Sequence, residues 1–324
     1  MIITNPTCNY EWALAIFTAR ESTETLRRTI ESAIGACGDR RSIIDVLVNG
    51  NLDLANQIAR VISGLSLEIG PSIRVWHLPV PDKAETWNQY IHELWPVADF
   101  TFFIDGYVAV EPNALREVSV RLAGDPVANC ATGVPSGGFF AARLRKKMIR
   151  EHGIHGNLYA LPHDVVLQLK LLPFRLPQGL YRTDPTMAAA LKFSLDPANN
   201  DWTPTKVLVV PEAKWQLPQV SWWTGAKIKA QWKRKIRQAQ GDFENMAVSQ
   251  HLAIDKRSPS QFPATVQELV DNWTTAHPDA AARMTRGSWW HQMALKNLSQ
   301  MKTWNSVEHP AQMLDSFNPY NSTN

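Results

Sequence analysis

The segment FTFFIDGY, residues 100–107, contains an almost continuous apolar run that stops at a carboxylate. Such a run is typical of a strand buried on both faces of a sheet, and Asp105-Gly106 ends it in a turn. In open α/β sheets, ligands bind outside the carboxyl ends of the strands. The segment therefore predicts a central strand with a candidate functional carboxylate, Asp105, at its carboxyl end.

Three further strand-like runs precede this segment, and helical periodicity follows each of them. We expect strands at 12–18, 43–48 and 73–78, and helices at 23–36, 52–65 and 83–95. Strands separated by helices of this length imply right-handed βαβ crossovers and a mostly parallel sheet covered on both faces. The sequence thus predicts an α/β fold whose polar strand ends share one edge of the sheet.

Beyond residue 111 the pattern is less regular. We expect a helix at 112–123, a Gly-rich stretch at 133–138, a basic helix around 143–150, a strand at 207–211 and a helical, Trp-rich segment at 258–324. The polar tail NPYNSTN is expected to be frayed.

The composition is that of an ordinary globular protein and excludes several classes. Of 324 residues, 44% are hydrophobic and 19% are charged, which excludes wholesale disorder. The formal net charge of +3 argues against nucleic-acid binding through bulk charge. Cys8, Cys37 and Cys130 form no C-x-x-C pair, which argues against a disulfide framework and favours a reducing compartment.

Targeting and membrane-spanning signals are not recognisable. The residues MIITNPTCNYEWALAIF show no basic n-region, and Glu11 precedes their apolar stretch, so we expect no signal peptide. No apolar run approaches the ~18 residues of a membrane-spanning helix. These features predict a cytoplasmic protein.

Several nucleotide and hydrolase motifs are absent from the sequence. No G-x-G-x-x-G follows the first strand, and no H-E-x-x-H or G-x-S-x-G occurs. The spacing from Gly133 to Gly138 is that of a P-loop, but Phe139-Phe140 replace the Lys and Ser/Thr that hold phosphate and Mg²⁺. A dinucleotide-dependent enzyme, a P-loop NTPase and an α/β-hydrolase are therefore disfavoured.

The strand-end residues, taken in chain order, resemble those of the family 2 glycosyltransferases, which have the GT-A fold. The resemblance extends over about residues 12–245. It consists of FTARES (17–22), VLVNGN (46–51), DKAETWNQ (82–89), FFIDGYVAVEPNAL (102–115), GNLYAL (156–161), GLYRTDPTMAAAL (179–191), VVPEA (209–213) and QWKRKIRQAQGDFEN (231–245).

This resemblance implies an inverting transfer of a sugar from a nucleotide sugar, expected to be UDP-linked, to a hydroxyl of a glycan or lipid-linked acceptor. It also implies an organisation of the chain. Residues 1–110 would bind the nucleotide sugar, residues 111–245 would bind the acceptor, and residues 246–324 would form a helical extension.

Asp105 matches the first acid of the family's D-x-D motif, whose carboxylates hold a divalent cation, Mn²⁺ or Mg²⁺, against the departing diphosphate. In this chain the triplet is Asp105-Gly106-Tyr107, so the second acid is a tyrosine. A water-bridged ion on Asp105, or cationic side chains in place of the metal, would each be physically adequate. The remaining alternative is an Asp that simply ends a strand in a turn.

The resemblance assigns the donor nucleotide to residues at several strand ends. Asn49 matches a position that faces the base, where an amide can donate to and accept from uracil. For Arg20 and Glu21 the alternative is a surface ion pair worth less than about 1 kcal/mol. The donor-binding positions that the resemblance implies are Ala19, Arg20, Glu21, Asn49, Lys83, Asn88, Asp105, Gly106 and Tyr107.

Asp184 matches the family's catalytic base. An inverting transfer needs a carboxylate that takes the proton from the acceptor hydroxyl, and the family places it in an acidic pair that opens a helix. Here the pair is Thr183-Asp184, followed by Pro185. The alternative role for Asp184 is a helix N-cap, where Asp is among the preferred residues. The implied acceptor and diphosphate positions are Gly156, Asn157, Thr183, Gln231 and Arg234.

The segment 213–241 is basic and contains no acidic residue. Gln231 and Arg234 keep the Q-x-x-R part of the Q-x-x-R-W signature of processive members, with Lys235 in place of Trp. An amphipathic basic helix here could pack in the core, contact the diphosphate or rest on an anionic membrane. For a lipid-linked acceptor we expect peripheral attachment at the cytoplasmic membrane face through this segment, whose tryptophans are Trp215, Trp222, Trp223 and Trp232, aided by the Trp289-Trp290 helix.

Two other functions stay open at this point. A sugar-nucleotide pyrophosphorylase shares the sheet order, but it would normally carry a Gly-rich, Arg-containing loop after the first strand, and FTARES has no glycine. A non-catalytic nucleotide-sugar-binding module would keep the fold without the reaction, as Tyr107 in place of an acid suggests.

Overall fold

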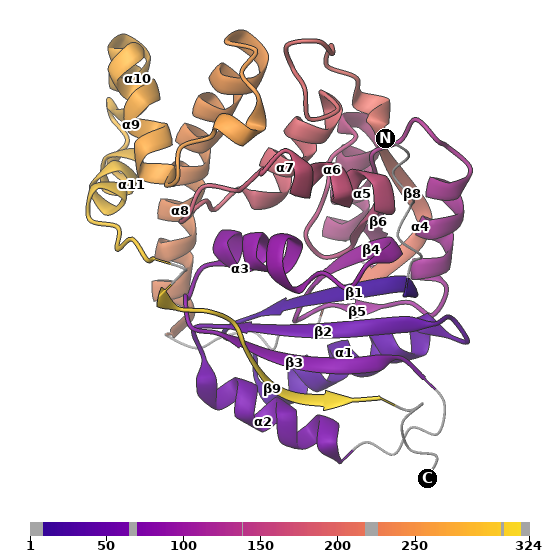
Figure 1. The fold of residues 1–324 in the computed structure, drawn as a ribbon. Coiled ribbons are helices and arrows are strands. Elements are labelled where there is room, and N and C mark those ends of the chain that lie inside the picture. Colours follow the sequence, from indigo (N-terminus) through magenta and orange to yellow (C-terminus); the bar gives the residue numbers. More distant parts are fainter. Residues whose placement is uncertain (1–8, 65–69, 138, 218–225, 306–307, 319–324) are drawn as a thin grey trace.

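The computed structural model describes residues 9–64, 70–137, 139–217, 226–305 and 308–318. Within them, nine strands form one sheet in the order β5-β8-β6-β7-β4-β1-β2-β3-β9, with helices on both faces (Figure 1). The strands are β1 (Tyr10–Thr18), β2 (Ser42–Asn49), β3 (Ser72–Leu78), β4 (Ala98–Asp105), β5 (Ala109–Val110), β6 (Cys130–Pro135), β7 (Tyr159–Pro162), β8 (Val207–Gln216) and β9 (Gln312–Phe317). The α-helices are α1 (Thr23–Cys37), α2 (Leu52–Ser63), α3 (Lys83–Gln89), α4 (Ala114–Ala123), α5 (Phe139–Glu151), α6 (His163–Leu171), α7 (Thr183–Lys192), α8 (Ala226–Ser249), α9 (Val266–Ala276), α10 (Pro278–Thr285) and α11 (Trp289–Ser299).

The four N-terminal strands that the sequence predicted are present and parallel, and each is slightly longer than expected. Strand β1 lies between β4 and β2, so the chain order reverses at β1. Such a switch point is where open α/β sheets bind ligands. In the register Phe17 of β1 lies opposite Asp105 of β4, which places both residues at the same edge.

The sheet is mostly parallel, as predicted, but antiparallel strands complete both of its halves. Strand β7 pairs antiparallel with β4 and β6, β5 pairs antiparallel with β8, and β9 pairs antiparallel with β3. Because β7 lies beside β4, the chain after residue 155 returns to the edge that carries Asp105. The acceptor half of the predicted site is therefore brought next to the donor half.

Side chains of β1 alternate between two hydrophobic cores. Leu14 and Ile16 pack with Leu26 of α1 and Ile58 of α2 on one face of the sheet. Phe17 points to the other face, where the buried residues come from α3, α6, α7, α8 and α9. Burying each large apolar side chain stabilises the fold by roughly 1.5–3 kcal/mol. The two cores therefore hold the strand ends in fixed positions.

Several helix boundaries differ from the sequence-based expectation. The helix expected at 83–95 is α3 followed by a π-helical turn at Tyr90–Leu94, and the helix expected at 112–123 begins at Ala114. The basic helix is α5, and the strand expected at 207–211 continues to Gln216. The strand is longer because β6 pairs with it on both sides of a register shift.

The C-terminal segment is helical as expected through α9, α10 and α11, but residues 312–317 form strand β9. β9 lies along the outer edge of the sheet beside β3, far from the helices that precede it (Figure 1). Its run QMLDSF lacks strict alternation, which explains why the sequence pattern missed it. The expected frayed tail falls mostly on residues 319–324, outside the described residues. In the described part of the chain, no helix is both long and apolar enough to cross a membrane.

Candidate active site

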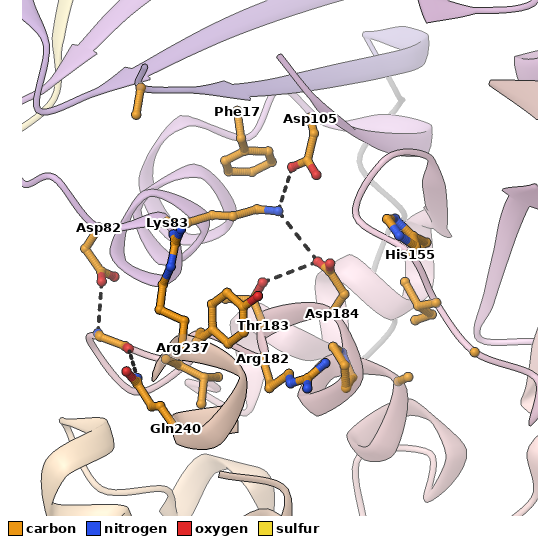
Figure 2. Close-up of a pocket in the computed structure, with 18 of the residues that line it drawn as sticks. Phe17, Asp82, Lys83, Asp105, His155, Arg182, Thr183, Asp184, Arg237 and Gln240 are labelled. Atoms are coloured by element: carbon orange, nitrogen blue, oxygen red, sulfur yellow. Dashed lines mark hydrogen bonds and ion pairs between the residues drawn. The ribbon is translucent and has the colours of Figure 1, made fainter. Parts of the chain in front are cut away.

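A cleft of about 1280 Å³ opens at the carboxyl ends of β1, β2 and β4 (Figure 2). Its walls come from the loops after these strands, the first turn of α3, and residues of α5, α7 and α8. The cleft contains most of the predicted site residues: Ala19, Arg20, Glu21, Asn49, Lys83, Asp105, Tyr107, Thr183 and Asp184. The resemblance therefore identified one continuous surface from segments far apart in the sequence.

The loop after β1 is folded around the carboxylate of Glu21. Oε2 of Glu21 accepts hydrogen bonds from Thr18 Oγ1 at 2.6 Å, from the Ala19 N–H at 2.8 Å and from the Arg20 N–H at 2.9 Å. Arg20 is left exposed at the cleft edge. The alternative considered from the sequence was a surface ion pair between Arg20 and Glu21. Glu21 does not form it, because its carboxylate accepts hydrogen bonds from Thr18, Ala19 and Arg20 of its own loop.

Asn49 at the end of β2 is buried at the base of the cleft. With the amide oriented to satisfy both atoms, Asn49 donates to Thr18 O at 2.6 Å and accepts from the Asp82 N–H at 3.3 Å. Asn49 thus joins the loops after β1 and β3 at the floor of the cleft.

Asp82 fixes the beginning of α3 and a distant loop together. Its Oδ1 caps the helix by accepting from the Glu85 N–H at 2.8 Å, and its Oδ2 accepts from the Gly179 N–H at 2.9 Å. On the other side of Gly179, its carbonyl accepts from Gln240 Nε2 of α8 at 3.2 Å (Figure 2). Burial raises the pKa of the Asp82 carboxyl. The loop at Gly179 therefore links α3 to α8 across the cleft.

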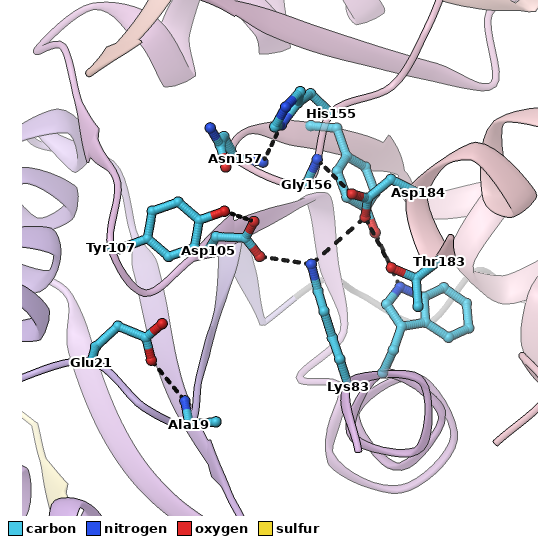
Figure 3. Close-up of polar contacts among 12 residues, drawn as sticks. Ala19, Glu21, Lys83, Asp105, Tyr107, His155, Gly156, Asn157, Thr183 and Asp184 are labelled. Carbon is cyan, nitrogen blue, oxygen red and sulfur yellow. Dashed lines mark hydrogen bonds and ion pairs between the residues drawn. The ribbon is translucent and has the colours of Figure 1, made fainter. Parts of the chain in front are cut away.

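Lys83, the first residue of α3, extends its ammonium between two carboxylates (Figure 3). Its Nζ lies 2.7 Å from Asp105 Oδ1 and 3.7 Å from Asp184 Oδ1. Burial disfavours the ammonium, but the charges of Asp105 and Asp184 outweigh burial and raise the pKa of Lys83. Lys83 is therefore a fixed positive charge at the centre of the site.

Asp105 is 9% exposed, and both of its oxygens have partners. Oδ1 bonds to Lys83, and Oδ2 accepts from the Tyr107 hydroxyl at 3.0 Å. Burial, together with the Asp105 carboxylate, raises the pKa of Tyr107, so its hydroxyl stays a donor at neutral pH. Tyr107 at the second D-x-D position thus donates to Asp105, where an acid would contribute a second carboxylate.

Asp184 is the second residue of α7, not its N-cap. The N-cap position is Arg182, and no side chain caps this helix. The Asp184 carboxylate instead accepts from the Gly156 N–H at 2.9 Å and from Thr183 Oγ1 at 3.3 Å (Figure 3). The capping role considered from the sequence is therefore wrong, and the carboxylate is held pointing into the cleft.

The loop before α7 is held by Glu244, a fully buried carboxylate of α8. Glu244 accepts from the Tyr181 N–H at 2.9 Å, from the Arg182 N–H at 2.8 Å and from Gln240 Nε2 at 2.7 Å. Burial raises the pKa of Glu244, while these donors favour its charged form. α8 thereby sets the position of the loop that leads into Asp184.

Two arginines flank the ring of Tyr181 at the mouth of the cleft. The guanidinium carbons of Arg182 and Arg237 lie 5.5 and 5.8 Å from the Tyr181 ring centroid. Among the described residues neither guanidinium has a carboxylate within ion-pair distance, and Arg182 Nε is buried without a hydrogen-bond partner. These two cations are therefore available to an anion in the cleft.

Six predicted site residues do not line this cleft, and one of them, Gly156, is the residue whose N–H donates to Asp184. Asn88 is buried, with both amide atoms bonded to the backbone of Leu176 at 2.8 and 2.9 Å, so it anchors a loop. Gly106 packs against Thr18, and Asn157 is 1% exposed. Gln231 and Arg234 are exposed on α8 and precede Arg237, the first residue of α8 that lines the cleft.

The cleft also contains residues that the sequence analysis missed. Asp82 and Arg182 are direct neighbours of predicted residues, and Arg237 and Gln240 lie farther along the basic helix. His155 lies beside Asp184, and burial lowers the pKa of its imidazole although Asp184 and Asp105 oppose that shift. At the far end Trp202 is 47% exposed, with Lys192 Nζ 4.8 Å from its ring centroid.

No family model and no curated protein matches this chain. Among solved structures, it is similar to a mannosyltransferase from Pyrobaculum calidifontis in complex with GDP-Man and Mn²⁺, with a TM-score of 0.56 and 13% identity over 93% of this chain and 79% of that one. A further match is glucosyl-3-phosphoglycerate synthase from Mycobacterium tuberculosis with Mn²⁺, UDP-Glc and glycerol 3-phosphate, with a TM-score of 0.45 and 14% identity over 73% of this chain and 79% of that one.

The first of these matches shows the fold: the chain has the GT-A fold of nucleotide-sugar glycosyltransferases. Both matched proteins hold Mn²⁺ in their solved structures. In the described residues of this chain, no group of three His, Cys, Asp or Glu side chains is placed to hold a metal ion. Asp105 has its oxygens bonded to Lys83 and Tyr107. A divalent cation is therefore plausible here only as an ion that takes most of its ligands from a diphosphate and water, because Asp105 is the one carboxylate of the triplet and is already paired.

Proposed function

We propose that this protein is an inverting glycosyltransferase that moves a sugar from a nucleotide sugar, in our expectation UDP-linked, to a hydroxyl of a glycan or lipid-linked acceptor. The observation that carries the proposal is the convergence of Asp105, Lys83 and Asp184 in one cleft at the switch point of the sheet. The GT-A fold supports it, since ligands of such sheets bind at this edge.

The donor nucleotide belongs, in this proposal, to the end of the cleft formed by the loops after β1, β2 and β3. Ala19, Arg20 and Asn49 line that end, and Glu21 shapes the loop that carries Arg20. Residues 1–110 would thus supply the nucleotide site, and residues 111–245 the acceptor site. The diphosphate would lie near Lys83, and the anomeric carbon between Asp105 and Asp184.

The reaction would proceed as a single displacement. Asp184 takes the proton of the acceptor hydroxyl while its oxygen forms a bond to the anomeric carbon. The bond from the anomeric carbon to the diphosphate oxygen breaks at the same time, and its electron pair stays on that oxygen. Lys83 stabilises the developing negative charge, and the shared cleft holds the two substrates in line. Attack opposite the leaving group inverts the anomeric configuration.

The acceptor belongs to the opposite end of the cleft, where α5 and α7 form the walls. Trp202 offers an exposed indole, and Lys147 and Lys192 supply positive charge. Burial lowers the pKa of Lys192. An indole face beside cations is suited to a sugar ring that carries hydroxyls or an anionic group.

We further propose that the protein acts in the cytoplasm and attaches peripherally to the membrane face when its acceptor is lipid-linked. The described part of α8 supports this through exposed Lys233, Arg234 and Lys235 next to Trp232, which is 52% exposed. Trp232 contacts Trp289 and Trp290 with ring centroids 5.7 and 5.2 Å apart. Trp215 is 1% exposed in β8, so the expectation that it contacts a membrane is wrong. Trp222 and Trp223 lie outside the described residues.

A screen of UDP- and GDP-sugars for donor hydrolysis and transfer tests the proposal. We expect one donor to be consumed, with release of the nucleoside diphosphate and an inverted anomeric product in proton NMR. Nucleotide binding with no turnover on any acceptor would instead identify a binding module. Formation of a nucleotide sugar from UTP and a sugar 1-phosphate would identify a pyrophosphorylase. Either of these results overturns the transferase proposal.

A further inference from the structure

The position that a metal would take in the D-x-D motif is surrounded by cationic and neutral donors in this chain. Lys83 Nζ contacts Asp105 Oδ1 at 2.7 Å, and Tyr107 donates to Asp105 Oδ2 at 3.0 Å (Figure 3). Mn²⁺ and Mg²⁺ require several oxygen ligands around one point. Asp105 is the one carboxylate in the triplet Asp105-Gly106-Tyr107. Its nearest neighbours are the Lys83 ammonium, which repels a cation, and the Tyr107 hydroxyl, which donates to the carboxylate and does not ligate a cation.

Lys83 is held in this position on several sides. A Cβ at Gly156 would lie 2.9 Å from Lys83 Nζ, so the chain approaches the ammonium as closely as glycine permits. The ring of Phe17 lies 5.9 Å from Nζ on another side. Asp184 adds a second carboxylate at 3.7 Å. The ammonium is therefore a built-in charge and not a mobile surface lysine.

A second pair of cations faces the same cleft from α7 and α8. Arg182 and Arg237 lie against Tyr181, and Figure 2 places both around the cleft that contains Lys83. Arg182 packs across Gly241, where an added Cβ would lie 2.3 Å from Arg182 Nε. That Nε is buried and has no hydrogen-bond partner in the described part of the chain. Guanidinium groups bind phosphate oxygens in a bidentate manner, so two arginines that line the cleft are suited to a diphosphate.

From these observations we infer that the cleft holds the diphosphate of its donor with Lys83, Arg182 and Arg237 and without a divalent cation. This inference rests on the proposed function and specifies how the leaving group is stabilised. Lys83 neutralises charge near the scissile bond, while the two arginines bind the outer phosphate oxygens. Asp105 then orients Lys83, which explains why the second acid of D-x-D is dispensable here.

Binding of UDP and GDP tests the inference by isothermal titration calorimetry, once with EDTA and once with MnCl₂. We expect one nucleotide to bind with an affinity that changes less than about 3-fold between the two conditions. Lys83→Met and Arg237→Met should each weaken binding by at least about 10-fold, the size expected for one charge-assisted hydrogen bond. Lys296→Met, on the exposed side of α11, should bind as the wild type does.

A measurement of Mn²⁺ binding to the wild-type protein tests the inference in a second way. Its result does not depend on whether a variant folds. Electron paramagnetic resonance of free Mn²⁺ should show no loss of signal when wild-type protein is added without nucleotide. Nucleotide binding that requires Mn²⁺, or a stoichiometric loss of the free Mn²⁺ signal, overturns the inference and leaves the transferase proposal standing. Failure of both nucleotides to bind with EDTA and with MnCl₂ overturns the transferase proposal as well.

Discussion

The backbone N–H of Gly156 donates to Asp184 Oδ2 at 2.9 Å and joins the loop before β7 to the first turn of α7. A Cβ at Gly156 would lie 2.6 Å from that same oxygen and 2.9 Å from Lys83 Nζ. The absence of a side chain at Gly156 therefore leaves the space in which the Lys83 ammonium and the Asp184 carboxylate meet.

Gly156→Ala should lower the rate of transfer by at least about 10-fold, because a displaced reacting group loses its alignment with the substrates. The change affects charged side-chain ends, so we expect the melting temperature to change little. Gly153→Ala is the matched control, since a Cβ at Gly153 meets nothing within 4 Å. Equal rates for the two variants would show that the Gly156 contact does not shape the site.

Asp105→Asn should preserve the fold and reduce transfer by at least about 100-fold, the size seen when a key electrostatic group is lost. The amide keeps the shape of the side chain but no longer holds the Lys83 ammonium by charge. Steady-state transfer assays and thermal melting measure the two effects. Asp99→Asn, at the exposed opposite end of β4, is the control. Near wild-type activity of Asp105→Asn would remove this carboxylate from the mechanism.

Asp184→Asn should bind the nucleotide as the wild type does and lose transfer almost completely, because the lost function is proton abstraction. Calorimetry of UDP or GDP and single-turnover transfer assays separate the two properties. Asp164→Asn, the equivalent exposed second residue of α6, should be unaffected in both. A parallel fall in nucleotide affinity and rate would assign Asp184 a structural role.

His251 predicts a pH dependence of stability. Burial lowers the pKa of its imidazole, while its hydrogen bond with Ser258 O at 3.0 Å opposes that shift. The unfolded chain therefore takes up a proton near the ordinary pKa of about 6.5, before the folded protein does, and stability falls as pH drops through that range. Hence the free energy of unfolding should decrease from pH 7.5 to 5.5 by more in the wild type than in His251→Gln. Urea denaturation at both pH values measures this difference, and equal decreases in the two proteins would contradict the prediction.

The peripheral membrane proposal predicts salt-sensitive binding to anionic vesicles. Liposome co-sedimentation at low salt should show binding to phosphatidylserine-containing vesicles and little to neutral ones, because each basic residue near an anionic surface contributes about 1 kcal/mol. Binding should weaken as salt is raised, since screening shortens to about 8 Å at physiological ionic strength.

The double variant Lys233→Gln, Lys235→Gln should reduce this binding by about 10-fold or more, as two such charges imply. Arg143→Gln, Lys146→Gln removes two exposed charges from α5 and is the matched control. Equal partitioning into both kinds of vesicle, or into neither, would leave α8 as part of the protein core and favour a soluble acceptor.

The sequence by itself determined the parallel core of the fold, and it put forward both candidate acids of the site. Buried runs such as 100–104 are local signals, and the residue that ends such a strand lies at the sheet edge whatever the rest of the chain does. The turn at Thr183-Asp184 is equally local, because it opens a helix. The positions of Asp105 and Asp184, at a strand end and at a helix start, could therefore be predicted without knowledge of their contacts, while their roles follow from the family resemblance and stay predictions.

Tertiary structure alone decided which neighbouring side chains face the cleft. Asn88 does not line it, because both of its amide atoms bond to the backbone of Leu176. On α8, Arg237 lines the cleft and Arg234 does not, although both side chains are exposed. Lys83 lies between two carboxylates from distant segments, and this charge arrangement exists only after the chain between β4 and α7 has folded back beside β4.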